Sequence, residues 1–446
     1  MPTRRNGLIL WLVLAVLVST YPANAQLVPL NPYLTQQARF TNVGYQIYPN
    51  PFGMYIPLIE IGNIRTGPLL IHPHFGMAQS YTDNVFRTDT LYGGRRSDTY
   101  TTLAPGLQLQ LPFMGRHRLV FDYRSNIERY SNESSQNVAD QTIGTNLVFN
   151  LRGGLTLSFL QELKTGHDYR GSATATGINE PNKFYNTIFG AEVLYAKQAF
   201  LRARYKYIRW EFIGENAGPR DGISFGDINT RNRVENYYAI AAGARVAPKT
   251  YLFLEEWIGT HTYEINKPLD STDYTTAAGV RWEATGKTVG EVTVGWQKKT
   301  YSNPSGIRGT GEFSGLYLNG NLYWTPLERT QVIFNLFRRT NETVVGGTRF
   351  FVSTGAGVDI RHAFTKKWRA TLQFLYDHDS YSDPIFADNK SLTRKDNYLT
   401  MGPGIWYQIQ PWLGARATYF YTERLSNFDS VQYNANVLMV SIQGQF

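Results

Sequence analysis

The chain has 446 residues, no cysteine and a formal net charge of +9. The lack of cysteine excludes disulfides, thiolate nucleophiles, cysteine zinc sites and lipid anchors attached to cysteine. Aromatic residues make up 14% of the chain, yet the mean hydropathy is only −0.33. This combination is typical of membrane-spanning strands that turn one face to lipid and the other to water.

The first 25 residues have the pattern of a secretory signal peptide. Arg4 and Arg5 precede an apolar run from Leu8 to Val18, and the small residues Ala23-Asn24-Ala25 follow it. We expect cleavage after Ala25. The run is too short to cross about 30 Å of hydrocarbon as a helix, which disfavours an N-terminal anchor. Without the two arginines, 42 basic residues remain against 35 acidic ones, a charge of +7 that is compatible with an anionic ligand but establishes none.

Beyond the signal peptide, the sequence divides into two parts. Residues 26–66 are rich in Pro, Asn and Gly and show no sustained alternation, which indicates a periplasmic N-terminal segment or a partial plug of the lumen. No later stretch approaches the ~20 consecutive apolar residues of a transmembrane helix. If the mature chain lies in a membrane, residues 67–446 must therefore cross it as strands.

Segments of ten to fifteen residues from about residue 69 onward alternate between apolar and polar residues, as strands of a membrane barrel do. One such segment places these apolar residues on a single face: Trp368, Ala370, Leu372, Phe374 and Tyr376. Its opposite face carries Arg369, Thr371 and Gln373. The apolar face is the expected lipid face.

The connections between these segments predict the strand number. Eight are short turns and nine are longer polar loops, the eighth of them at Ser382–Arg394, so seventeen connections join about eighteen strands. An even number is usual for bacterial single-chain barrels. The prediction is an all-β fold: a monomeric, antiparallel, up-and-down transmembrane barrel with short turns at the periplasm and a lumen wide enough for water. A soluble β-sandwich, the alternative, rarely uses so many strands.

Aromatic residues mark the ends of the predicted barrel. The tryptophans beside predicted periplasmic turns suit a girdle at the level of the lipid headgroups: Trp282, Trp324, Trp368 and Trp412. The chain ends with apolar residues at positions 438, 440 and 442 and an aromatic Phe446 in the same register. Phe446 is thus a candidate C-terminal signal for the barrel-assembly machinery, although Gly444 departs from that pattern.

Local motifs add a family resemblance. They are Tyr81-Thr82-Asp83-Asn84-Val85, Ser97-Asp98-Thr99, Ala104-Pro105-Gly106-Leu107, Phe121-Asp122-Tyr123 and Arg129-Tyr130. The chain resembles the putative beta-barrel porin family associated with exopolysaccharide and capsule export in Gram-negative bacteria. The resemblance implies an outer-membrane location and a role in releasing surface polysaccharide. It implies outer-membrane lipid, the assembly machinery, polysaccharide and periplasmic export components as partners, with no nucleic acid, no cofactor and no catalytic residues.

A set of basic residues is the nearest approach to a functional site. Arg202, Arg204 and Lys206 share one side of segment 199–212. Five more lie on inferred inner faces: Arg124, Arg245, Arg281, Arg369 and Arg416. Together they could form a basic wall for an anionic sugar chain. Equally, they could pair across strands with acids such as Asp122, Glu192, Glu283 and Asp359.

Other side chains support weaker hypotheses. Tyr317 and Phe420 on inner faces could stack on sugar rings or simply fill the wall. His72 and His74 share a strand face but lack a third metal ligand nearby, so we expect no metal site. The neighbouring Ser and His residues, His378 with Ser380 and His117 with Ser125, lack a catalytic signature, so we expect no enzyme.

Three functions remain open from the sequence. The favoured one is export or passage of surface polysaccharide, which rests on the resemblance. The second is a general diffusion porin for small solutes, anionic ones included. The third is a non-conducting structural or adhesive barrel.

Overall fold

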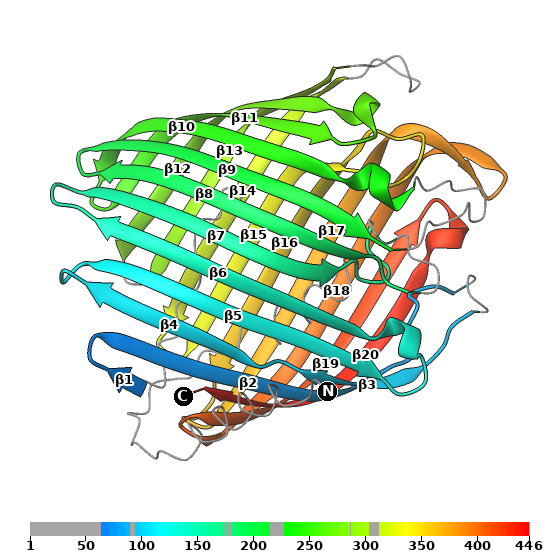
Figure 1. The fold of residues 1–446 in the computed structure, drawn as a ribbon, viewed down its shortest axis with the longest axis horizontal. Coiled ribbons are helices and arrows are strands. Elements are labelled where there is room, and N and C mark those ends of the chain that lie inside the picture. The colour runs from blue at the N-terminus through cyan, green and yellow to red at the C-terminus, as the bar shows by residue number, and fades with distance from the viewer. Residues whose placement is uncertain are drawn as a thin grey trace, which may run out of the picture.

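The chain forms one closed barrel of eighteen antiparallel strands in up-and-down order (Figure 1). Each strand pairs with the next along the chain, and β20 pairs with β2 to close the sheet. This computed structural model describes residues 64–445 except 90–93, 174, 176–179, 215–226, 286 and 303–311. The predicted fold and strand number are confirmed. The predicted signal peptide, nearly all of segment 26–66, and Phe446 lie outside the described residues.

The strands are β1 Ile64–Thr66, β2 Leu69–Thr82, β3 Asp98–Leu103, β4 Gly106–Phe113, β5 His117–Tyr130, β6 Val138–Asn150, β7 Leu155–His167, β8 Lys183–Ala196, β9 Ala199–Ile213, β10 Arg233–Ala247, β11 Thr250–Tyr263, β12 Ser271–Thr285, β13 Thr288–Tyr301, β14 Glu312–Leu327, β15 Thr330–Glu342, β16 Phe350–Ala363, β17 Trp368–Ala387, β18 Lys390–Gln410, β19 Leu413–Ser426 and β20 Tyr433–Gln445. Short 3-10 helices lie in the loops: η1 Ser134–Gln136, η2 Ile228–Arg231, η3 Lys267–Leu269 and η5 Asp429–Val431. In the described part of the chain, no helix is long and apolar enough to cross a membrane.

The split of one barrel strand at a proline, together with the short strand β1, explains why twenty segments form eighteen barrel strands. β3 and β4 are halves of one barrel strand, because both pair with β2 and β5, and they are separated at Ala104-Pro105. Proline cannot donate to the strand ladder; there the Pro105 carbonyl accepts a hydrogen bond from the Ser125 amide. In β18, pairing with β19 skips from Met401 to Gly404, so Pro403 interrupts that edge. β1 pairs only with the start of β2, which leaves eighteen barrel strands.

The two faces of each strand meet different surroundings, as β17 illustrates. Leu372 and Phe374 are 40% and 42% exposed on the outside of the barrel. Arg369, Thr371 and Gln373 are buried on its inner side. The observed register of β17 is the predicted one, because only apolar side chains are stable against lipid.

This register yields a first test. Leu372→Arg is expected to impair assembly by ~2 to 4 kcal/mol if the site lies near the membrane midplane. The matched variant Gln373→Arg, one residue along on the inner face, should fold normally. Heat-modifiable migration of the outer-membrane fraction measures assembly, and equal tolerance at the two positions would contradict the assigned faces.

The β17–β18 hairpin differs from the prediction. The polar stretch Ser382–Arg394 was expected to be a loop, but the two strands continue through it and reach 20 and 21 residues. They extend past the other strands at the end of the barrel with the long loops (orange in Figure 1). Asp388 and Asn389, at φ 49° and 57°, form the two-residue turn, and Asp and Asn tolerate this left-handed region. The stretch is polar because several of its side chains face the inside of the barrel.

Candidate functional site: the lumen and its long-loop mouth

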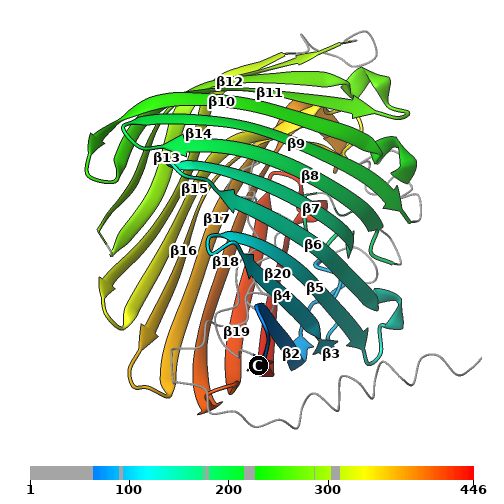
Figure 2. The same cartoon turned by 60° about the vertical axis from the view of Figure 1, so that its left-hand side comes forward.

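The loops at one end of the barrel fold inward over the lumen. We call this end the long-loop end and the opposite one the short-turn end; Figure 2 shows both rims. In loop 168–182, between β7 and β8, the Gly171 carbonyl accepts hydrogen bonds from Arg424 Nη1 and the Tyr433 hydroxyl, both at 3.2 Å. Arg424 lies on β19 and Tyr433 on β20, which β2 to β6 separate from β7 in the sheet. Residues 168–173 of this loop therefore reach across the mouth.

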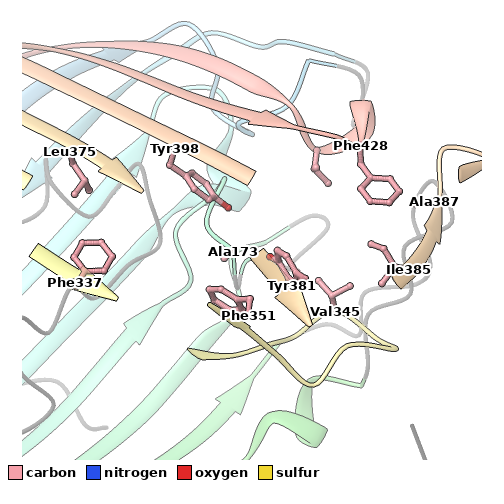
Figure 3. Packing of buried hydrophobic residues seen from close by; sticks show 11 residues of the cluster. Ala173, Phe337, Val345, Phe351, Leu375, Tyr381, Ile385, Ala387, Tyr398 and Phe428 are labelled. Atoms are coloured by element: carbon pink, nitrogen blue, oxygen red, sulfur yellow. The ribbon is translucent and has the colours of Figure 1, made fainter. Parts of the chain in front are cut away.

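Apolar side chains pack together where these loops meet. The members of this mouth cluster are Ala173, Phe337, Val345, Phe351, Leu375, Tyr381, Ile385, Ala387, Tyr398, Phe428 and Val431. They come from three loops and from strands β15 to β18, and Figure 3 shows Ala173, Phe351, Tyr381 and Val345 gathered at its centre. Burying apolar surface stabilises the inward position of the loops. The mouth cluster therefore covers part of the long-loop end.

Loop 83–97 is fixed to the same mouth. Its Phe86 ring lies 5.4 Å from the Arg96 guanidinium and 5.5 Å from that of Arg170. Asp83 is bonded to Arg95 and accepts hydrogen bonds from the backbone and side chain of Asn436. Partial burial acts to raise the pKa of Asp83, but these hydrogen bonds outweigh it and hold the pKa below its usual range. The tether therefore persists into acid conditions.

A cavity of about 440 Å³ lies directly beneath the mouth cluster, since Ala173, Val345 and Phe351 line it too. Its side wall carries three aromatic rings in edge contact. The Trp257 centroid lies 6.1 Å from that of Tyr237 and 5.9 Å from that of Tyr317. The volume is within the ~300 to 1,000 Å³ range of small-molecule sites.

Charged side chains around the cavity are balanced and mostly paired. Five basic residues line it, not counting histidine: Lys164, Lys206, Arg231, Arg233 and Arg339. Five acidic residues face them: Asp140, Asp168, Glu235, Asp273 and Glu342. Arg231 lies 2.8 Å from Asp168, and Arg233 lies 2.7 Å from Glu235. The wall thus offers many hydrogen-bonding groups without a large excess of either charge.

A second group of charges, which we call the ionic band, lies nearer the short-turn end. Arg202 contacts Glu255 at 2.6 Å and Glu291 at 3.1 Å. Arg204 also pairs with Glu255, and Arg281 lies 3.6 Å from Glu291. These contacts join β9, β11, β12 and β13 across the inner surface. Three of the predicted basic residues therefore lie together, and each has an acidic neighbour.

A match to a known protein family covers all of the barrel strands. The family described as Putative beta-barrel porin 2 matches residues 57–446. The chain belongs to this family. It is a porin-like β-barrel of the outer-membrane type, as the resemblance of its sequence implied. No curated protein matches the chain in sequence.

Solved structures of outer-membrane barrels are weakly similar to this porin-family barrel. OpdK from Pseudomonas aeruginosa is 12% identical, with a TM-score of 0.44 over 84% of this chain and 99% of that chain. OccAB3 from Acinetobacter baumannii is 10% identical, with a TM-score of 0.42 over 84% and 99%. The siderophore receptor PirA from A. baumannii is 10% identical, with a TM-score of 0.39 over 84% and 80%. Nothing about ligand or mechanism is carried over at these scores.

The other predicted basic residues of the porin-family barrel are spread around the wall. Arg124 pairs with Asp122 and lies 3.5 Å from Glu162. Arg369 and Arg416 donate to the Gln408 and Thr371 side chains, both at 3.1 Å. Lys206 is buried at the cavity and Arg245 is exposed at the short-turn end. The predicted basic residues therefore do not form one continuous basic wall.

The acidic residues that balance this set were only partly anticipated. Asp122 forms an ion pair with Arg124, and Asp359 lies 3.0 Å from Arg361. The side chain of Glu283 lies outside the described residues. Sequence reasoning missed Glu255 and Glu291, although each lies on the inner-facing parity of its strand and could have been found by that signal.

The aromatic and histidine candidates lie in distinct places. Trp324 and Trp368 are about two-fifths exposed on the outside, and Trp412 is similarly exposed in the short turn between β18 and β19. Trp282 is half-buried, close to Gly290, and the girdle stays a prediction. Tyr317 lines the cavity, whereas Phe420 packs with Ala78, Val437 and Met439.

Histidines fill polar positions of the inner wall. His72 and His74 are buried on β2. The His74 ring packs directly against Gly106, where any larger residue would clash with it. His117 packs near Phe113 and Phe149. Within the described ranges, no group of three or more potential ligand side chains could hold a metal.

Proposed function

We propose that this porin-family barrel passes a surface saccharide chain across the outer membrane and that the cavity beneath the mouth cluster holds a sugar unit during passage. The observation that carries the proposal is the contact of Tyr237, Trp257 and Tyr317 beside a wall of paired charges. Sugars present apolar C–H faces and a rim of hydroxyl groups. Aromatic rings suit the faces, and carboxylate, guanidinium and amide groups suit the hydroxyls.

The covered mouth supports a selective path over general diffusion. An open eighteen-strand barrel would leave an aqueous channel. Here residues 168–173 and the mouth cluster cover part of the long-loop end. A covered mouth narrows the path, and a polar cavity behind it provides groups that can bind a passing solute, which supports a selective path over an open or a purely structural barrel.

The balanced charges favour a neutral saccharide, or one with few charges, as the ligand. An anionic chain would need an excess of basic groups, but the cavity has equal numbers of each sign. The polysaccharide hypothesis is therefore narrowed to neutral or weakly charged chains, because most of the basic residues predicted from the sequence are paired with acidic ones.

Binding of neutral oligosaccharides to the purified protein tests this proposal. We expect Tyr237→Ala to weaken binding by up to about tenfold, because losing an aromatic contact costs about 0.5 to 1.4 kcal/mol. The matched control is Tyr185→Ala, whose side chain is 50% exposed on the outer face of β8. Isothermal titration calorimetry measures both affinities.

Three outcomes would count against the proposal. They are no saccharide binding by the wild type, equal loss of affinity in the two variants, and much tighter binding of acidic than of neutral saccharides. The last result would restore the basic-wall hypothesis.

A further inference from the structure

A carboxyl group lies on the lipid-facing side of β11. Glu256 is exposed on the outer face of the strand, and its neighbours on that face are Leu254 and Ile258, which are 67% and 38% exposed. The residue paired with it on β10 is Ile240, which is 70% exposed. Glu256 therefore lies among side chains that contact lipid, an environment that is unfavourable for a carboxyl group.

The height of Glu256 in the barrel places it well inside the hydrocarbon. Thr250, six residues earlier on β11, pairs with Trp282 of the predicted girdle. A strand tilted by about 40° gains about 2.6 Å of membrane height per residue, so Glu256 lies roughly 16 Å from the girdle. The apolar band of such barrels is about 25 Å tall. Glu256 is thus more than 5 Å from either edge of this band.

The bonds of Glu256 within its own chain are few. The Thr276 hydroxyl on β12 donates to its Oε2 at 2.5 Å. Among the described residues, no ion pair with a basic side chain accompanies this hydrogen bond. Ionisable groups in membranes usually face a partner or a water-filled cavity, because exposure to hydrocarbon is costly. Beyond Thr276, a further partner for this carboxyl group on the outer face would have to come from a neighbouring molecule.

We infer that the outer face of β10 to β12 around Glu256 is an interface between two copies of this chain in the membrane. The patch carries the acceptor, Glu256, and hydroxyl groups that could donate to it from a second copy, those of Tyr238 and Tyr274, which are 51% and 44% exposed. A surface with both partners is self-complementary, as a two-fold interface requires.

Small side chains beside the carboxyl group permit the close approach of a second barrel. Ala242 and Ala278 are both exposed, and both pair with Leu254, on opposite sides of β11. Small residues recur where membrane-spanning helices pack closely, because they let backbones approach each other. The inferred interface places a second copy against an outer wall that was predicted to contact only lipid in a monomeric barrel. The inference does not depend on the proposed saccharide ligand.

The absence of cysteine makes the interface testable by single-cysteine cross-linking. In membranes treated with a bismaleimide, Ala242→Cys is expected to give a species of twice the chain mass. The matched control, Val440→Cys on β20, is 54% exposed on a distant part of the outer wall and should stay at the mass of one chain. In the Ala242→Cys background, Glu256→Gln should keep most of the product, because the amide still accepts and donates. Glu256→Leu should lose most of it.

Several results would overturn this inference. They are the lack of a product from Ala242→Cys, an equal product from Val440→Cys, or full cross-linking by a folded Glu256→Leu variant. If Glu256→Leu fails the heat-modifiability control for folding, native mass spectrometry of the wild type decides. Two or more chains per particle support the interface, and one chain contradicts it.

Discussion

Removing the Arg424 side chain together with the Tyr433 hydroxyl, in the double variant Arg424→Ala/Tyr433→Phe, is expected to raise the conductance of the barrel severalfold. Both groups donate to the Gly171 carbonyl, and Arg424 also donates to the Val431 carbonyl in the β19–β20 connection. Loss of the two bonds to Gly171 costs the inward position of residues 168–173 about 2 kcal/mol or more. That shifts the closed-to-open ratio roughly thirtyfold.

Single-channel recording in a planar bilayer measures this effect. The matched control is Arg416→Ala, an inner-face arginine on the same strand that lies three residues from the short-turn start of β19 and donates to Thr371. Its conductance should stay near that of the wild type. If the double variant and the control conduct alike, the loop tether does not cover the path.

The second large effect concerns ion selectivity. Arg202→Gln/Arg204→Gln should make the pore prefer cations, because Glu255 and Glu291 then lose the arginines that neutralise them. Side-chain charge in a confined path controls which ions pass. In a tenfold salt gradient, whose limit for a perfectly selective monovalent pore is about 59 mV, we expect a shift on the order of 10 mV.

The reciprocal variant is the control for this interpretation of the ion selectivity. Glu255→Gln/Glu291→Gln should shift the reversal potential toward anions, and the combination of all four substitutions should return it close to the wild-type value. An unchanged potential in a folded Arg202→Gln/Arg204→Gln protein would mean that the ionic band does not line the conducting path.

Much of the fold could be predicted from the sequence because lipid and water impose opposite demands on neighbouring residues. Leu372 and Gln373 illustrate this: each lies on the face that its polarity indicates. The prediction was wrong at Ser382–Arg394, where polarity was taken to mean a loop. Asp383 and Arg394 are instead buried inside the mouth, bonded to Arg349 and Asp396. Polarity alone does not distinguish a wet loop from the wet face of a strand.

The site was less predictable because it depends on the curvature of the closed sheet. Arg202 and Glu291 are on strands that are not neighbours, and only the shape of the barrel brings them within 3.1 Å. The inward position of the loops had a weak signal, since Val345 is an apolar residue at the tip of a predicted polar loop. No spacing in the sequence indicates that Ala173 and Val345 meet across the mouth.

Wild-type channel current with a neutral oligosaccharide added to one side tests most directly whether the lumen is a covered, saccharide-selective path. We expect a conductance well below that of an open eighteen-strand pore, with brief interruptions whose frequency rises with saccharide concentration. A large, steady conductance that the saccharide leaves unchanged would contradict the claim.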